Sequence, residues 1–359
     1  MNDGVLSDAQ IEQLIANGQI SAPMTFENGQ VQPASLDLRL GDRAFRVRAS
    51  FLAGRGRKVS DRLAQFTMHE VDLTGGGAVL EKGCVYVVPL LEALDLPDDL
   101  SGAASAKSST GRLDLLTRII TDDGVEFDRV PKGYTGPIYA EICPRSFSVL
   151  VHPGLMLTQM IFRKGATFLS DEELATLHNT TPIVDGTPVI SDGLGFSVDL
   201  TPRDGDLVGY RAKPHTGVID LSQIGAYDPA EYWEEVRTKD ERIILDPGAF
   251  YILVSNEAIA IPPDYAAEMA PYLAMVGEFR VHYAGFFDPG FGWDGAGGAG
   301  SRGVLEVRCH EAPFVLEHGQ VVGRLVYERM SETPRTLYGR EIKSNYQGQG
   351  LKLSKHFRT

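Results

Sequence analysis

The sequence contains few cysteines, has an excess of acidic over basic side chains and lacks any long apolar run. Its three cysteines, Cys84, Cys143 and Cys309, are far apart and odd in number. This argues against a disulfide framework and against a Cys-x-x-Cys metal site, so we expect buried free thiols. With 34 Lys and Arg against 48 Asp and Glu, the formal net charge is −14. Such a charge disfavours a broad nucleic-acid-binding surface, although a local cluster can still hold a small anion.

No apolar run approaches the ~18 residues that a membrane span requires. Residues 1–18 have neither the basic flank nor the apolar stretch of a secretory signal. We therefore expect a cytoplasmic protein without a membrane or nucleic-acid partner. The length of 359 residues, with 43% hydrophobic and 23% charged residues, fits a soluble protein of two domains.

An internal repeat is the most informative feature that is present. Residues 80–162 align without a gap on residues 245–327, a constant shift of 165 positions (245 − 80). The identical pairs are Leu80 and Leu245, Gly83 and Gly248, Tyr86 and Tyr251, Glu92 and Glu257, Ala93 and Ala258, Pro97 and Pro262, Asp99 and Asp264, Glu141 and Glu306, and Gly154 and Gly319. Self-similarity of this kind indicates a duplicated domain. We place the first domain at 1–165, the second at 166–337 and a separate C-terminal segment at 338–359.

Most of both copies has the pattern of short strands separated by Gly or Pro turns, which predicts two small, mostly β, barrel-like domains. The expected strands are 35–40, 84–90, 137–142, 147–151, 155–162, 249–254, 303–309, 314–318 and 321–328. Capping residues predict short helices at 8–17 and 171–178, and a further one opening at 228–231. The glycine-rich residues 292–303 are expected to be a mobile loop, and they lack the Gly-Lys-Ser/Thr ending of a phosphate loop.

A polar, cationic cluster occurs in the first copy alone. Lys107, Ser108, Ser109 and Arg112 combine two adjacent hydroxyls with two cations beside a glycine, a set that suits phosphate oxygens. The second copy has Tyr-Leu-Ala-Met-Val-Gly at 272–277 instead. A purely structural turn would more readily be kept in both copies, so the difference favours ligand binding. A polar turn at a barrel rim is the alternative.

Glu141 is a candidate acid or base. In the predicted strand 137–142 it faces the same side as Tyr139, and a carboxylate on the inner face of a barrel is costly unless it is paired or hydrogen-bonded. Such carboxylates often have perturbed pKa values and catalytic roles. Glu306 occupies the same place in the second copy, so a structural role for the position is the alternative.

The C-terminal segment 338–359 has little hydrophobic patterning, several cations and a Tyr-Gln-Gly-Gln-Gly core. This composition predicts a segment that is disordered by itself and able to fold over an anionic ligand. A frayed terminus without function is the alternative.

Taken together and in order, these motifs resemble the dCTP deaminases of the dUTPase-like superfamily, and in particular their long, duplicated bacterial form. SDAQIEQLIANGQI resembles the opening helix of the family, and SLDLRLGD resembles its next strand. ALDLPDDLSGAASAKSSTGRLDL resembles the Leu-Pro segment followed by Arg-Ser-Ser-x-x-Arg-Leu-Gly-Leu. GYTGPIYAEI and HPGLMLTQMIF resemble two later strands, and SNYQGQG resembles the Lys-Tyr-x-x-Gln lid.

The resemblance implies a mainly β fold of two tandem dUTPase-like distorted barrels with a few short helices, the first barrel catalytic and the second degenerate. It implies hydrolysis of dCTP to dUTP and ammonia. By its motifs, Glu141 would be the general acid/base, Ser108 would position water and contact phosphate, and Arg112 would support the glutamate and the substrate.

By the same resemblance, Lys107 and Ser109 would contact the triphosphate, and Tyr338, Tyr346 and Gln349 would belong to the lid. Mg²⁺ would bridge phosphate oxygens. The H-x-E and P-C-x-x-C patterns of zinc deaminases do not occur in the sequence, so no zinc is expected. A homotrimer, in effect a pseudo-hexamer of barrels, and an intramolecular arrangement of the two domains are equally compatible with the sequence.

The sequence departs from the family pattern at several positions. Lys107 stands where the family has arginine, Asp114 stands where it has glycine, and Pro131-Lys132-Gly133 stands where it has Asp-Pro-Gly. Asp288-Pro289-Gly290 does occur in the second copy, together with Glu306.

Two alternatives to a deaminase remain. The first is a dUTP diphosphatase or a bifunctional deaminase-diphosphatase, although the Arg-Gly-x-x-Gly-Phe-Gly-Ser arm of diphosphatases is absent. The second is a non-catalytic nucleotide-binding oligomer.

Overall fold

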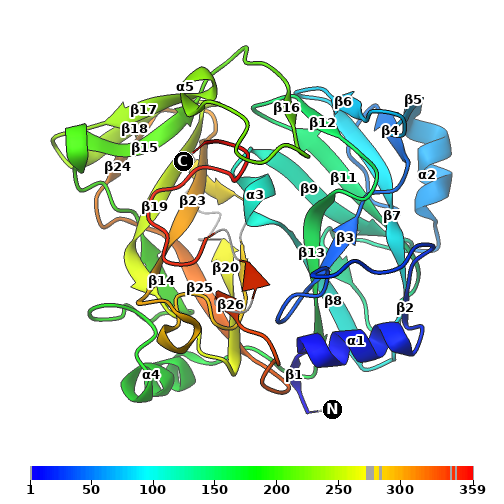
Figure 1. Ribbon diagram of the computed structural model, residues 1–359, viewed down its shortest axis with the longest axis horizontal. Helices are drawn as coiled ribbons and strands as arrows, with labels where there is room; N and C mark the ends of the chain where they lie inside the picture. The colour runs from blue at the N-terminus through cyan, green and yellow to red at the C-terminus, as the bar shows by residue number, and fades with distance from the viewer. Residues whose placement is uncertain (1, 272–278, 283–284, 340–341, 344–345, 359) are drawn as a thin grey trace.

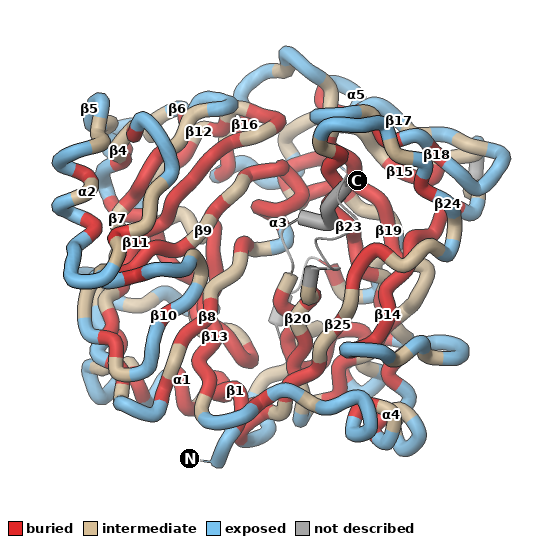
Figure 2. The backbone as a smooth tube through the Cα atoms, turned by 180° about the vertical axis from the view of Figure 1, so that it is seen from behind, coloured by how far each residue is buried: buried red, intermediate tan, exposed pale blue. Residues whose placement is uncertain are grey.

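The structure, a computed structural model, describes residues 2–271, 279–282, 285–339, 342–343 and 346–358. Two β-rich lobes lie side by side, one from each half of the chain, and the C-terminal segment passes between them (Figure 1). The prediction of a mainly β fold with a few short helices is confirmed. Buried residues run along the strands of both lobes, whereas the peripheral loops are exposed (Figure 2).

The first lobe contains three sheets. Their orders are β1-β13-β8-β10 with β3 also paired to β13, β5-β4-β7-β11-β9 with β2 also paired to β7, and β16-β12-β6. Their strands are β1 (Gly4–Val5), β2 (Ile20–Ser21), β3 (Leu36–Arg39), β4 (Arg43–Val47), β5 (Thr67–Asp72), β6 (Ala78–Leu80), β7 (Val85–Asp95), β8 (Leu100–Ala106), β9 (Leu115–Thr121), β10 (Arg129–Val130), β11 (Thr135–Pro144), β12 (Val149–Val151), β13 (Met156–Lys164) and β16 (Ile219–Asp220). Strand β16 comes from the second half of the chain and pairs in parallel with β12, so it ties that half to the first lobe.

The second lobe contains sheets of order β14-β25-β20-β22 and β17-β15-β19-β23-β21, and the pairs β18-β24 and β26-β27. Their strands are β14 (Leu194–Ser197), β15 (Leu207–Ala212), β17 (Trp233–Arg237), β18 (Arg242–Leu245), β19 (Phe250–Ile259), β20 (Tyr265–Pro271), β21 (Phe279–His282), β22 (Phe286–Phe287), β23 (Ser301–Cys309), β24 (Phe314–Glu317), β25 (Val321–Arg329), β26 (Tyr338–Gly339) and β27 (Ile342–Lys343). The shift of 165 residues relates β8 to β20 and β13 to β25 residue for residue. The sequence repeat is therefore also a repeat of strands.

Five α-helices lie in the described ranges: α1 (Asp8–Ala16), α2 (Val59–Phe66), α3 (Ser108–Gly111), α4 (Asp171–Thr180) and α5 (Pro229–Tyr232). Helix α1 begins with the predicted capping box, in which Ser7 accepts from the backbone of Gln10 and the Gln10 side chain accepts from the backbone of Ser7. The glycine-rich loop predicted at 292–303 contains a short 3-10 turn, Asp294–Ala296, and its end already belongs to β23. Among the described helices, none combines the length and the apolar character needed to cross a membrane.

Buried ion pairs join the two lobes. The guanidinium of Arg163 donates to both carboxylate oxygens of Glu328 at 2.6 Å and to Glu268 at 2.8 Å. Glu328 is the residue that matches Arg163 in the second copy, 165 positions later. The two copies thus meet through equivalent strands, β13 and β25, whose matched residues Arg163 and Glu328 carry opposite charges. Removal of one partner from such a buried pair is strongly destabilising, so this contact fixes how the lobes dock.

Candidate active site

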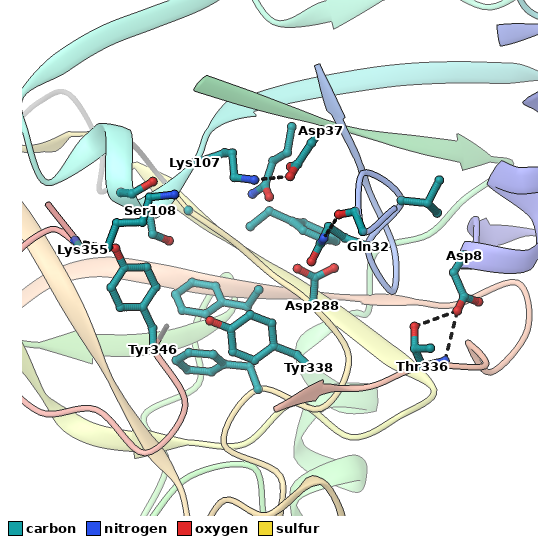
Figure 3. A pocket seen from close by; sticks show the side chains of 18 of the residues that line it. Asp8, Gln32, Asp37, Lys107, Ser108, Asp288, Thr336, Tyr338, Tyr346 and Lys355 are labelled. Atoms are coloured by element: carbon teal, nitrogen blue, oxygen red, sulfur yellow. Dashed lines mark hydrogen bonds and ion pairs between the residues drawn. The ribbon is translucent and has the colours of Figure 1, made fainter. Parts of the chain in front are cut away.

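A cavity of about 940 Å³ opens between the two lobes (Figure 3). Three parts of the chain line it. The first half supplies Asp8, Glu12, Ile15, Ala16, residues 26–29, Val31, Gln32, Asp37, Lys107, Ser108, Ser109, Arg112 and Gln159. The second half supplies Met269, residues 285–288, Phe291, Val304 and Glu306, and the C-terminal part supplies Thr336, Tyr338, Tyr346, Gln349 and Lys355. All the substrate-binding residues predicted from the sequence, and both Ser108 and Arg112, therefore line one cavity.

The cationic side of the cavity is the turn around α3. The backbone amides of Thr110 and Gly111 donate to the Lys107 carbonyl at 2.8 and 3.0 Å. These hydrogen bonds close a helical turn in which Ser108 is exposed. The Lys107 ammonium pairs with the carboxylate of Asp37 (Figure 3). Burial raises the pKa of Asp37, and the positive charge of Lys107 opposes this rise. Lys107 remains beside the open space, as a phosphate contact requires.

Arg112 is buried at the centre of the site, and the C-terminal segment covers it. Its Nη2 donates to Oε1 of Gln349 at 2.9 Å, and its Nη1 donates to the carbonyl of Lys352 at 3.0 Å. The guanidinium carbon lies 3.8 Å from the ring centroid of Tyr346, which is a cation–π contact. The predicted lid residues Tyr346 and Gln349 are thus the ones that hold Arg112.

Glu306, on β23, brings a carboxyl group from the second lobe to the same cavity. Burial raises its pKa to about 8, and the nearby charge of Arg112 works in the opposite direction. Phe286, Phe287 and Phe291 form an apolar wall on this side. The site therefore combines a carboxyl group that titrates near neutral pH, a buried cation and an apolar wall for a flat ring.

Asp288 is a second buried carboxyl group in the cavity. Its Oδ1 accepts from the backbone amide of Ala34 at 3.2 Å, a contact between the lobes. Burial raises its pKa to about 7, and the negative charge of Asp37 adds to the rise. Asp288 begins the Asp-Pro-Gly motif that the first copy lacks.

Glu141, the acid/base predicted from the sequence, does not line this cavity. It is buried within the first lobe, where the guanidinium of Arg118 donates to its Oε1 from Nη2 at 2.5 Å and from Nε at 3.2 Å. Arg118 also lies 3.6 Å from the ring centroid of Phe127 and donates to Ser50. Within one chain, the structure separates Glu141 from Ser108 and Arg112 because the first lobe presents its cationic turn to the second lobe. The neighbour of that turn is Glu306, the equivalent carboxylate of the other copy.

The C-terminal segment is held at its far end as well as over the cavity. Phe357 is buried against the rings of Tyr227, Tyr232 and Trp233, with centroids 5.5 to 6.4 Å apart. The Ser354 hydroxyl donates to the carbonyl of Ser109 at 2.7 Å. Residues 346–358, packed in this way, form an ordered strap across the site.

Sequence reasoning did not select Glu306, Asp288, Asp37 or Lys355 for the site. A signal for two of them was present, because Asp288-Pro289-Gly290 and Glu306 occur together in the copy without the cationic cluster. The second copy lacks the cationic turn, and the first copy lacks the Asp-Pro-Gly motif, although it has a glutamate, Glu141, at the position that matches Glu306. That complementarity predicts a site made between them.

Known proteins resemble this chain over both halves. The family model described as the 2'-deoxycytidine 5'-triphosphate deaminase (DCD) N-terminal domain matches residues 2–166, and the model for the DCD C-terminal domain matches residues 170–357. A protein of Parafrankia sp. named "dCTP deaminase, dUMP-forming" is 32% identical over 163 residues, 44% of this chain and 76% of the relative. A "dCTP deaminase" of Halorubrum lacusprofundi is 29% identical over 160 residues, again 44% and 76% of the two chains.

The crystal structure of 2'-deoxycytidine 5'-triphosphate deaminase from Agrobacterium tumefaciens is similar over nearly the whole molecule. It superposes with a TM-score of 0.88 at 53% sequence identity and covers 92% of this chain and 100% of that one. The two family models, the relatives and this structure agree with the resemblance seen in the sequence motifs. The chain belongs to the dCTP deaminase family, in its long two-domain form.

Proposed function

We propose that the chain hydrolyses dCTP to dUTP and ammonia at one site per chain, built from both lobes, with Glu306 as the general acid/base. The observation that carries the proposal is that Glu306 lines the same cavity as Ser108 and Arg112, although the glutamate comes from the other copy of the repeat. Membership of the dCTP deaminase family supports the choice of substrate.

The proposed reaction adds water to C4 of the cytosine ring. The Glu306 carboxylate takes a proton from the attacking water and delivers it to the ring nitrogen N3. The exocyclic amine then takes the second proton of the former water, the C4–N bond breaks, and ammonia leaves a uracil ring. A carboxyl group with a pKa of about 8 suits both directions of transfer, because the most efficient acid/base titrates near the working pH.

The other side chains of the cavity bind and orient the substrate in this proposal. The hydroxyl of Ser108 is exposed to the cavity and can hold the water or a phosphate oxygen. Arg112 favours the ionised form of Glu306, since its charge opposes the effect of burial. Lys107, Ser109 and Lys355 provide donors for the triphosphate, and Tyr346 and Gln349 close over it.

We expect Mg²⁺ to bind with the triphosphate. Within the described ranges, no group of three or more His, Cys, Asp and Glu is arranged to hold a metal ion, so the phosphate oxygens would supply most ligands. Water activation in this proposal rests on Glu306 and does not use zinc.

A site that is complete within one chain also has a consequence for the oligomeric state. Each chain supplies the phosphate-binding turn, the carboxyl group and the strap of its own cavity. A homotrimer, our expectation from the resemblance, would then place complete sites side by side and would not be needed to build them.

A second candidate is a bifunctional enzyme that also cleaves dUTP to dUMP and pyrophosphate. One observation favours it: the Parafrankia relative is named as dUMP-forming. The additional step needs a carboxylate to activate water at the α-phosphate. Asp288 and Asp37 are carboxyl groups of the cavity that the deamination does not use.

The test is incubation of the purified chain with dCTP and Mg²⁺, with chromatographic separation of dCTP, dUTP and dUMP and a parallel ammonia assay. Equal amounts of dUTP and ammonia are expected. Equal amounts of dUMP and ammonia, with pyrophosphate, would replace the proposal by the bifunctional reaction. Tight binding of dCTP without any product would replace it by the non-catalytic alternative.

A further inference from the structure

Asp114 has an unusual backbone conformation beside the site. It follows α3 and precedes β9, two residues after Arg112, and its φ is +54°. Left-handed backbone suits glycine, and it strains other residues, although aspartate tolerates it better than most. Polar contacts of the Asp114 side chain can offset this strain.

The carboxylate of Asp114 is buried and joins the two lobes. Its Oδ2 accepts from the hydroxyl of Ser146 in the first lobe at 2.6 Å and from Nη2 of Arg308 in the second lobe. Arg308 also donates to Ser146 at 3.2 Å, and its Nη1 donates to the carbonyl of Gly248 at 2.5 Å. Arg308 is thus fixed within its own lobe while it contacts the other one.

The position of this contact relates it to the site. Asp114 lies two residues after Arg112, and Arg308 lies two residues after Glu306. Alternate residues of a strand point to the same side, so Glu306 and Arg308 both project from β23 toward the first lobe. The contact between Asp114 and Arg308 therefore runs beside the space between Arg112 and Glu306 and sets how closely the two lobes approach there.

We propose that Asp114, Ser146 and Arg308 form a positioning link that holds Arg112 and Glu306 at their working separation. This inference rests on the proposed function, because it assigns a geometric requirement to the same site. Asp114 and Arg308 are positioning residues and do not line the cavity. Loss of the link should lower kcat more than it raises KM, since Lys107, Ser109 and Gln349 still bind the triphosphate.

The test separates positioning from stability by the use of a double variant of the full-length chain. Asp114→Gly removes the backbone strain but leaves Arg308 buried without its carboxylate, so both Tm and kcat should fall. Asp114→Gly combined with Arg308→Met removes both charges, and replacement of a buried ion pair by apolar groups is often neutral for stability. Its Tm should recover, but kcat should stay about 10- to 100-fold below wild type, the loss expected from a misplacement of about 1 Å.

The matched control is Asp192→Gly, which changes another aspartate with positive φ, at an exposed position outside the cavity. It should keep wild-type kcat and KM. Recovery of kcat together with Tm in the double variant would show that Asp114 and Arg308 act on stability alone and would overturn the inference. If the double variant does not fold, Asp114→Asn takes its place in the test. It weakens the hydrogen bond to Arg308, so kcat should fall about threefold. An unchanged kcat in this variant would overturn the inference. Absence of product from the wild type and from Asp192→Gly would instead remove the proposed function.

Discussion

The two equivalent glutamates provide a matched pair of variants. Glu306→Gln keeps the size of the side chain and its hydrogen-bonding oxygen but removes its ability to carry a proton. General acid–base catalysis by one positioned group contributes about 10²- to 10⁴-fold in rate. Because Glu306 is proposed to act both on the water and on the ring, we expect kcat to fall at least ~10³-fold, or about 4 kcal/mol of transition-state stabilisation. KM for dCTP should change less than about threefold, since binding rests on other side chains.

Glu141→Gln is the control, because it makes the same change at the equivalent position of the first lobe. Glu141 is as buried as Glu306, but its partner is Arg118 and it lies outside the cavity. The Arg118 side chain is 27% exposed and can regain water when the ion pair is weakened. We expect a loss of stability of about 1–3 kcal/mol, seen as a lower Tm, and an unchanged kcat at 25 °C.

The assay is ammonia release at saturating dCTP, with Tm measured on the same preparations. We expect an inactive but stable Glu306→Gln and an active but less stable Glu141→Gln. An inactive Glu141→Gln beside an active Glu306→Gln would return the acid/base role to the first copy. Equal activity of both variants and the wild type would show that neither carboxylate transfers the proton.

Three further predictions follow from the same contacts. Burial raises the pKa of Glu306 from 4.5 to about 8, so the stability that its protonated form contributes is present below about pH 4.5 and lost as the pH rises to about 8. Over this range the free energy of unfolding of wild type should fall relative to that of Glu306→Gln by up to about 5 kcal/mol, seen as a growing difference in Tm. A Tm difference that does not depend on pH would contradict the raised pKa. Tyr346→Leu should lower kcat/KM by about 5- to 30-fold, because it removes the cation–π contact with Arg112, which is worth ~1–2 kcal/mol. Tyr346→Phe keeps the ring and should stay near wild type. Equal kcat/KM values of the two variants would show that the ring contact does not matter. Phe357→Ala should destabilise the chain by about 3–5 kcal/mol and speed amide hydrogen exchange at 353–358, and unchanged exchange would show that the aromatic cluster does not anchor the strap.

The elements with local signals could be predicted from the sequence. Helix α1 has its capping box in four adjacent residues, Ser7 to Gln10, and the strands of each copy have alternating apolar patterns between glycines. The cationic turn from Lys107 to Arg112 was also visible, because its donors are neighbours in the chain. Helix α2 was missed, since the side chain of its N-cap residue, Lys58, accepts no hydrogen bond. The amide of Val59, the first residue of this helix, donates instead to Oδ1 of Asp122 at 2.8 Å, far away in the chain.

The partner of the cationic turn could not be predicted in the same way. Two glutamates, Glu141 and Glu306, occupy equivalent positions, and the choice between them depends on which faces of the lobes dock. Docking is decided by contacts between residues far apart in the chain, such as Arg163 with Glu328 and Asp114 with Arg308. No local sequence pattern reports these contacts, because they depend on how the two folded lobes dock.

The repeat has a genetic consequence. In an assembly of identical barrels, one codon change alters both the phosphate-binding half and the carboxylate half of every site at once. Here the phosphate-binding turn and the carboxylate are encoded by different codons, with Ser108 and Glu306 separated by 198 positions (306 − 108), so each can vary without the other. Positions related by the repeat should therefore tolerate substitution very differently, with Glu306 constrained where Glu141 accepts any residue that satisfies Arg118.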